Sequence, residues 1–121
     1  DLVIADGNFP TESMGKECIV VRCDGHGIPE LLDAILEVFP LDTYVENPVN
    51  LMEVMKGDNV KTPIWDEYKN IIGKHDDRGS NFISTIERFK FYEEAKKAYA
   101  IIATGEKALY ANVILQKGVV I

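Results

Sequence analysis

Residues that build disulfides and metal sites are scarce in this sequence. Its 121 residues include two cysteines, Cys18 and Cys23, and two histidines, His26 and His75. The cysteines are five positions apart in a predicted strand, so they face opposite sides and are not expected to bond to each other. Free thiols are typical of a reducing compartment, which favours the cytoplasm.

Catalytic signatures of the common enzyme classes are also absent. The sequence has no phosphate-cradling glycine motif, no nucleophile elbow and no His/Cys set with metal-ligand spacing, so we expect neither a nucleotide nor a metal. His26 lies in a Gly-flanked turn and is more easily interpreted as a solvated turn residue than as a ligand. His75 lies in a charged stretch and is predicted to be on the surface.

The charge balance and the lack of long apolar runs exclude two classes of partner. The formal net charge is −7, which disfavours binding to nucleic acid or to an anionic membrane surface. No apolar run approaches the length that spans a bilayer. Hydrophobic residues are 46% of the chain and charged residues 27%, which is the balance of a globular domain.

Strand-like and helix-like segments alternate along the chain. We therefore predict one α/β domain over residues 1–121, layered α/β/α around a mixed central sheet. The capping-box pattern at 84–87 is equally compatible with the end of a strand. The segment 44–45 is a weaker strand candidate. The main predicted strands are 2–5, 18–22, 99–103 and 110–115, and the main predicted helices are 29–39, 62–72 and 88–98.

Polar residues at the ends of these elements are the candidates for a site. Asp6 ends the first strand, where α/β folds place ligand-binding groups, but an Asx-turn role is equally plausible. Arg88 lies near a helix start, where it can grip a ligand or form a local salt bridge. Trp65 and Tyr68 can stack on a sugar, although a hydrophobic lid over the sheet is the more common role.

The stretch ALYANVILQKG places an asparagine where a buried strand usually carries an aliphatic residue. Tyr110 and Asn112 are two apart, so a strand would present both to the same side. Their hydroxyl and amide groups suit a small polyhydroxylated ligand. The alternative, slightly favoured by the residues alone, is an internal polar network.

Several runs, taken together and in order, resemble the L-fucose mutarotase family, the fucose relatives of D-ribose pyranase. The arginine-bearing ERFKFYE run is similar to the fucose branch. The runs are VIADGNFP (3–10), the R-x-DG-x-x-IPELL run (22–32), FPLDTYVENP (39–48), TPIWDEY (62–68), ERFKFYEEAKKAYAIIATGE (87–106) and YANVILQKGV (110–119).

The resemblance implies an enzyme that interconverts the α and β anomers of a free sugar without a cofactor. It also implies that Asp6, Arg88, Tyr110, Ala111 and Asn112 contact the substrate, with Ala111 contributing only through its backbone. A homo-oligomer is expected, and rings are known in the family.

The family's catalytic histidine belongs to a Gly-His-Gly run that would lie upstream of Asp1. Leu2 to Ala5 already has the composition of a buried strand, so we expect the natural protein to carry this run and a first helix before Asp1. Two alternatives stay open: a non-catalytic monosaccharide-binding module, and a ribose-type pyranase.

Overall fold

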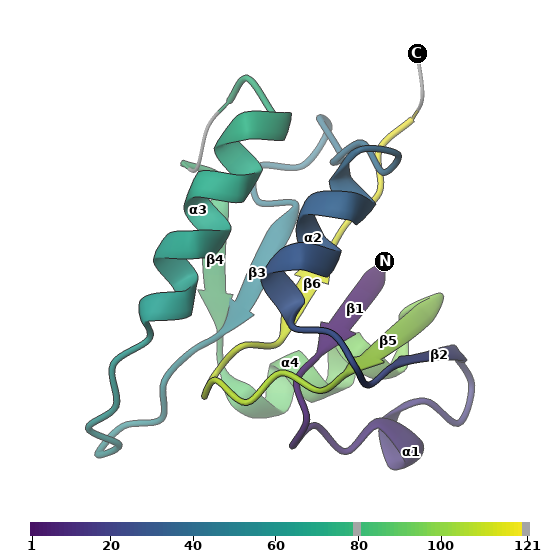
Figure 1. Ribbon diagram of the computed structural model, residues 1–121, viewed down its shortest axis with the longest axis vertical. Helices are drawn as coiled ribbons and strands as arrows, with labels where there is room; N and C mark the ends of the chain where they lie inside the picture. Colours follow the sequence, from purple (N-terminus) through teal and green to yellow (C-terminus); the bar gives the residue numbers. More distant parts are fainter. Residues whose placement is uncertain (79–80, 120–121) are drawn as a thin grey trace.

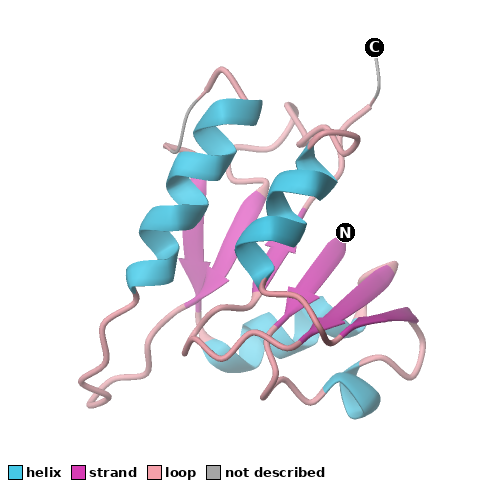
Figure 2. Cartoon of the chain, viewed as in Figure 1, coloured by secondary structure: helices cyan, strands magenta, loops and turns pink. Residues whose placement is uncertain are grey.

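A six-stranded mixed sheet forms the centre of the molecule (Figures 1 and 2). The computed structural model describes residues 1–78 and 81–119. The strand order is β2-β5-β1-β6-β3-β4, in which only β6 runs against its neighbours. The strands are β1 (Leu2–Ala5), β2 (Ile19–Cys23), β3 (Val49–Met52), β4 (Ile83–Ile86), β5 (Ala100–Thr104) and β6 (Val113–Leu115).

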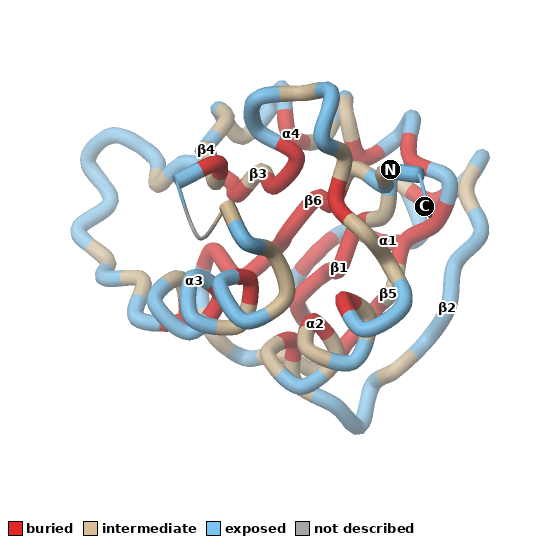
Figure 3. The backbone as a smooth tube through the Cα atoms, turned by 90° about the horizontal axis from the view of Figure 1, so that it is seen from above, coloured by how far each residue is buried: buried red, intermediate tan, exposed pale blue. Residues whose placement is uncertain are grey.

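Helices cover both faces of this sheet, which confirms the predicted α/β/α layering. Figure 3 shows α2 and α3 on one side of the sheet and α1 and α4 on the other. Within the described residues, no helix is both long and apolar enough to cross a bilayer. The helices are α1 (Thr11–Met14), α2 (Ile28–Leu36), α3 (Pro63–His75) and α4 (Arg88–Lys96).

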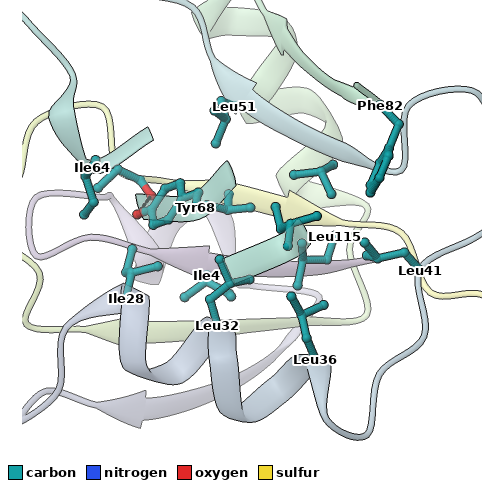
Figure 4. Close-up of a cluster of buried hydrophobic side chains, with 14 residues drawn as sticks. Ile4, Ile28, Leu32, Leu36, Leu41, Leu51, Ile64, Tyr68, Phe82 and Leu115 are labelled. Atoms are coloured by element: carbon teal, nitrogen blue, oxygen red, sulfur yellow. Dashed lines mark hydrogen bonds between the residues drawn. The ribbon is translucent and has the colours of Figure 1, made fainter. Parts of the chain in front are cut away.

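Two hydrophobic clusters, one on each face, hold the layers together. In α2, Ile28, Leu32 and Leu36 recur every four residues and point at the sheet, as an amphipathic helix requires. Tyr68 of α3 packs among the same aliphatic side chains (Figure 4). On the other face, Phe91 and Ala95 of α4 are fully buried.

The antiparallel strand β6 decides where the polar residues gather. Val113 lies opposite Ile4 of β1 and opposite Leu51 of β3. Because β6 runs the other way, the residues just before it lie at the edge where β1 and β3 end. That edge is the carboxyl end of the parallel strands, where α/β proteins place ligands.

Three details differ from the sequence-based predictions. The short elements α1 and β3 were not predicted, because four residues carry little periodicity. Tyr44-Val45 lies in a bend, so the strand expected there is wrong. By contrast, the strand that was one of two alternatives for the segment ending at Glu87 is confirmed over residues 83–86, and Glu87 is the N-cap of α4. The last strand begins at Val113 and not at Tyr110.

Candidate functional site

A cavity of about 270 Å³ opens at the carboxyl ends of β1, β3 and β4. It brings together four of the five candidate residues, which are Asp6, Arg88, Tyr110 and Asn112. The fifth, Ala111, is fully buried and does not line the cavity. The walls also carry Asp58, which sequence reasoning missed, and apolar side chains that include Phe9 and Leu109.

Asp6 turns out to make the Asx-turn and to line the cavity as well. Its Oδ1 accepts from the backbone N–H of Asn8 at 3.0 Å. Burial raises the pKa of this carboxyl, and the charge of Glu106 adds to the rise; the backbone N–H groups of Asn8, Ala111 and Phe9 oppose it. Asp6 is therefore a carboxyl whose ionisation costs free energy in the folded protein.

Asn112 has a structural oxygen and a free nitrogen. Its Oδ1 accepts from the backbone N–H of Asp6 at 2.7 Å, where the strand pairing of β1 and β6 has ended. Its Nδ2 donates to no other group in the described part of the chain, and Asn112 lines the cavity. The oxygen thus belongs to an internal polar network, while the nitrogen is available to a ligand.

The geometry predicted for Tyr110 and Asn112 is wrong, although both residues line the same cavity. Residues 110–112 are not a strand, and Tyr110 has a left-handed backbone with φ of 54°. A non-glycine residue pays about 1–2 kcal/mol for that conformation, so the surrounding contacts must hold it. Strand alternation therefore does not explain why the two side chains converge.

Two aromatic donors on α3 hold this irregular segment. Trp65 Nε1 donates to the carbonyl of Tyr110 at 2.7 Å, and the Tyr68 hydroxyl donates to the carbonyl of Ala111 at 2.7 Å. Burial raises the pKa of the Tyr68 hydroxyl, so it keeps its proton. Neither aromatic ring lines the cavity. They position the segment and do not stack on a ligand there.

Glu106, which sequence reasoning did not select, ties the loop before this segment to α2 and to the turn after β1. Its carboxylate accepts from the backbone N–H groups of Ile28 at 2.9 Å, Lys107 at 3.0 Å and Ala108 at 3.2 Å. Its carbonyl accepts from the N–H of Gly7 at 2.8 Å. The sequence signal that could have selected Glu106 is its place in a Gly-Glu turn directly after a buried strand. Its carboxylate lies at the N-terminus of α2, where negative charge is favoured.

Arg88, the first residue of α4, has an unpartnered buried nitrogen. Its Nε is the one buried side-chain nitrogen or oxygen without a hydrogen bond among the described residues. The local salt bridge considered for it is wrong, since no carboxylate lies within 4.0 Å of its guanidinium in the described chain. Glu87 already caps α4 by accepting from Phe89 N and Lys90 N. Arg88 lines the cavity, so a guanidinium with a donor that the described fold leaves unused lies at its wall.

A second charged cluster lies at the opposite end of the sheet. His75 ends α3 and is mostly buried, with its Nε2 2.6 Å from Asp33 Oδ1 and its Nδ1 3.9 Å from Glu37 Oε1. It is therefore not the surface loop residue expected. These three residues offer possible metal ligands, but Lys74 competes for Asp33 at 3.3 Å. His26, an exposed turn residue as predicted, lies 2.7 Å from Glu30.

Comparison with known proteins identifies the family. The profile of the RbsD/FucU transport protein family matches residues 1–120. The chain belongs to the RbsD/FucU family.

Individual RbsD/FucU family members match nearly all of the chain. Human fucose mutarotase is 49% identical, over 98% of this chain and 79% of that protein. The structure of FucU from Bifidobacterium longum is 65% identical, with a TM-score of 0.97 over 99% of this chain and 84% of that one. The fucose mutarotase of Streptococcus pneumoniae, solved in complex with L-fucose, is 48% identical, with a TM-score of 0.90 over 99% of this chain and 83% of that one.

Proposed function

We propose that this RbsD/FucU family member is an L-fucose mutarotase, an isomerase that interconverts the α and β anomers of the free sugar. Its relatives in human and Streptococcus pneumoniae carry that name, and the latter is solved with L-fucose. The observation on this chain that carries the proposal is the unpartnered Nε of Arg88 beside a cavity lined by Asp6, Tyr110 and Asn112.

The cavity has the size and the hydrogen-bonding groups that suit a monosaccharide. Its volume of about 270 Å³ lies just below the roughly 300–1,000 Å³ of drug-sized ligand sites. Arg88 and the Asn112 amide nitrogen are donors, while Asp6 and Tyr110 offer oxygens. A sugar hydroxyl both donates and accepts, so neighbouring hydroxyls can satisfy both kinds of group. Phe9 and Leu109 supply apolar surface for a methyl group or a ring face.

The reaction needs a proton to be taken from one sugar oxygen and a proton to be given to another. The anomeric hydroxyl loses its proton, the ring oxygen gains one, and the C1–O5 bond breaks to give the open aldehyde. Rotation about C1–C2 and the reverse steps close the ring on its other face. A positioned general acid/base accelerates such steps by about 10²–10⁴-fold. Groups that hold both anomers equally do not speed the reaction.

We assign that proton transfer to the family histidine expected upstream of Asp1. Neither histidine of the present chain lines the cavity: His26 lies beside Glu30, and His75 lies beside Asp33 at the other end of the sheet. A neutral imidazole near its ordinary pKa can both take and give a proton at neutral pH. Asp6 and Tyr110 then bind and orient the sugar.

Saturation-transfer NMR between the two anomeric protons of L-fucose tests the proposed function. The protein with its upstream segment should exchange the anomers far above the spontaneous rate, and replacing the upstream histidine by alanine should abolish this. Residues 1–121 alone should bind fucose and leave exchange near the spontaneous rate. Rapid exchange by residues 1–121 alone would refute the upstream assignment and point to Asp6 or Tyr110.

The same measurement separates the two alternatives. A non-catalytic binding module would bind L-fucose without accelerating exchange in any form of the protein. A ribose-type pyranase would accelerate interconversion of D-ribose forms and leave fucose unchanged. The similarity to proteins named fucose mutarotases favours fucose.

We also propose a cytoplasmic homo-oligomer, with a ring as the expected arrangement. Cys18 and Cys23 are both free thiols, as a reducing compartment favours. The edge strand β2 exposes Ile19, Val20 and Val21, which are 50%, 38% and 45% exposed, so this edge is open to pairing or packing. Sedimentation equilibrium at micromolar concentration tests association, and a monomer would contradict it.

A further inference from the structure

The hydroxyl of Tyr110 is held from two sides by one turn. It donates to Oδ2 of Asp58 at 2.6 Å and accepts from the backbone N–H of Met55 at 3.3 Å. Asp58 N in turn donates to the carbonyl of Met55 at 2.9 Å, which closes the turn over residues 55–58. Gly57 has φ of 89° at the third position, as a type II turn requires.

This arrangement fixes the direction of the phenol proton. A hydroxyl that donates to a carboxylate at 2.6 Å forms a strong, charge-assisted hydrogen bond. The hydroxyl has one proton and two lone pairs, and Met55 N–H occupies one lone pair. One lone pair is then left for the cavity, so Tyr110 can accept from a ligand there but cannot donate to it.

We propose that Asp58 is a specificity-determining residue of the cavity, because it makes the Tyr110 hydroxyl an acceptor that selects a sugar hydroxyl able to donate. The proposal rests on the proposed function, since it concerns the same sugar site. Asp58 also lines the cavity, so its effect is local to the ligand. A sugar with an ether oxygen or a fluorine at the position facing Tyr110 offers no proton and is rejected.

The test uses a panel of monodeoxyfluoro analogues of L-fucose, each lacking one hydroxyl donor. Calorimetric titration gives the affinity of every analogue for the full-length protein and for Asp58→Ala, Asp58→Asn and Asn59→Ala. In Asp58→Ala the freed phenol proton can turn toward the ligand. We expect fucose affinity to fall about tenfold. For the analogue in which fluorine replaces the hydroxyl that faces Tyr110, the affinity relative to that for fucose should rise.

The other variants are the controls. Asp58→Asn keeps an oxygen that accepts from Tyr110, so it should retain the discrimination of the parent. Asn59→Ala removes an exposed neighbouring side chain outside the cavity lining. It should change neither the affinity for fucose nor the relative affinities of the analogues. In the background of Tyr110→Phe, Asp58→Ala should have little further effect on affinity. Equal weakening of all analogues by Asp58→Ala, or full additivity with Tyr110→Phe, would overturn the proposal.

A second measurement needs no ligand and keeps this proposal separate from the proposed function. With ¹³Cζ-labelled tyrosine, the Tyr110 resonance of the ligand-free protein should shift in Asp58→Ala and stay in place in Asn59→Ala. An unchanged Tyr110 signal in folded Asp58→Ala means that Asp58 does not hold the hydroxyl. If the Tyr110 signal shifts but the parent protein fails to bind fucose, the proposed function fails and the contact with Asp58 stands.

Discussion

Arg78 and Arg88 stand at opposite ends of the sheet, in very different surroundings. Arg78 donates from Nε and Nη2 to Asp76 and from Nη1 to the carbonyl of Asp42, and it stacks on Phe82 at 4.4 Å. Arg88 has a buried Nε with no partner in the described chain. One guanidinium is satisfied by its own fold, and the other is not.

Cavity size and unsatisfied polar groups point to opposite ends of the sheet. The cavity beside Arg78 has a volume of about 670 Å³, and that beside Arg88 about 270 Å³. At the larger one Arg78 is paired with Asp76, and His75 with Asp33. At the smaller one the Arg88 Nε and the Asn112 Nδ2 are both without partners in the described residues. The unsatisfied polar groups therefore favour the smaller cavity as the candidate site, although it has the smaller volume.

Replacing Arg88 by lysine should have the largest effect on sugar binding. A compact ammonium cannot reproduce the planar fork of donors, and hydrogen bonds to charged groups are worth about 1.5–3 kcal/mol. We expect the Kd for L-fucose to rise at least about tenfold, measured by calorimetric titration. Arg78→Lys is the matched control and should leave the Kd unchanged while lowering thermal stability. Equal effects of both variants on the Kd would refute the contrast.

Asn112→Ala should weaken both folding and binding, because the two ends of its amide have different roles. The buried N–H of Asp6 loses its partner, which costs about 1–3 kcal/mol of unfolding free energy. The ligand loses the Nδ2 donor, so the Kd for fucose should also rise. Urea unfolding and calorimetric titration on the same sample measure the two. A change in stability alone would make Asn112 purely structural.

Trp65→Phe tests whether the aromatic residues of α3 act through the backbone of the cavity segment. The variant keeps an aromatic ring and removes the donor to the Tyr110 carbonyl, a contribution of about 0.5–1.5 kcal/mol. We expect a several-fold rise in Kd together with a modest fall in the thermal midpoint, because the Tyr110 carbonyl loses this hydrogen bond in the ligand-free protein as well. A tryptophan that stacked on the sugar would instead be replaced by phenylalanine with little loss. Unchanged affinity would therefore contradict the positioning role.

Asp6→Asn should stabilise the folded protein at neutral pH while weakening fucose binding. Burial raises the pKa of Asp6 above its ordinary 3.8, so the folded state holds that proton more tightly than the unfolded chain. The stability that Asp6 contributes is thus present below pH 3.8 and is lost as the pH rises through its folded pKa. The gain in thermal midpoint from Asp6→Asn should be seen at pH 7 and vanish below pH 3.8.

Asp33→Asn, at the opposite end, should have the smallest effect and none on the sugar. Hydrogen bonds from His75 and then Lys74 lower the pKa of Asp33. Its contribution to stability is therefore present above pH 3.8 and lost as the pH falls through the lowered folded pKa. We expect a small drop in thermal midpoint at pH 7 that disappears in acid. Altered fucose affinity would show that the two ends are coupled.

Much of the architecture was predictable, because long elements carry clear periodicity. The apolar spacing in α2 indicated both the helix and its buried face. The short β3 could not be found this way, and its absence from the prediction hid where β6 pairs. Without that antiparallel pairing, the sequence offers no reason for Asp6 and Asn112 to meet.

The convergence of the candidate residues on one cavity was predicted, but the backbone geometry that brings them together was not. Resemblance to the family selected Asp6, Arg88, Tyr110 and Asn112, which line one cavity. Asp58 was missed, because a carboxylate in an exposed, irregular segment resembles any solvated loop residue. Its importance comes from a hydrogen bond to Tyr110 across 52 positions, and no local pattern encodes such a contact.

The most direct test observes the unpartnered nitrogen itself. The chain has three arginines, Arg22, Arg78 and Arg88, so the ¹⁵Nε–H signals can be assigned with one substitution each. On saturation with L-fucose, the Arg88 Nε–H signal should shift and its exchange with water should slow. The signals of Arg22 and Arg78, which already donate to Asp24 and Asp76, should stay in place. Fucose binding that leaves the Arg88 signal unchanged would contradict the assignment of this cavity as the sugar site.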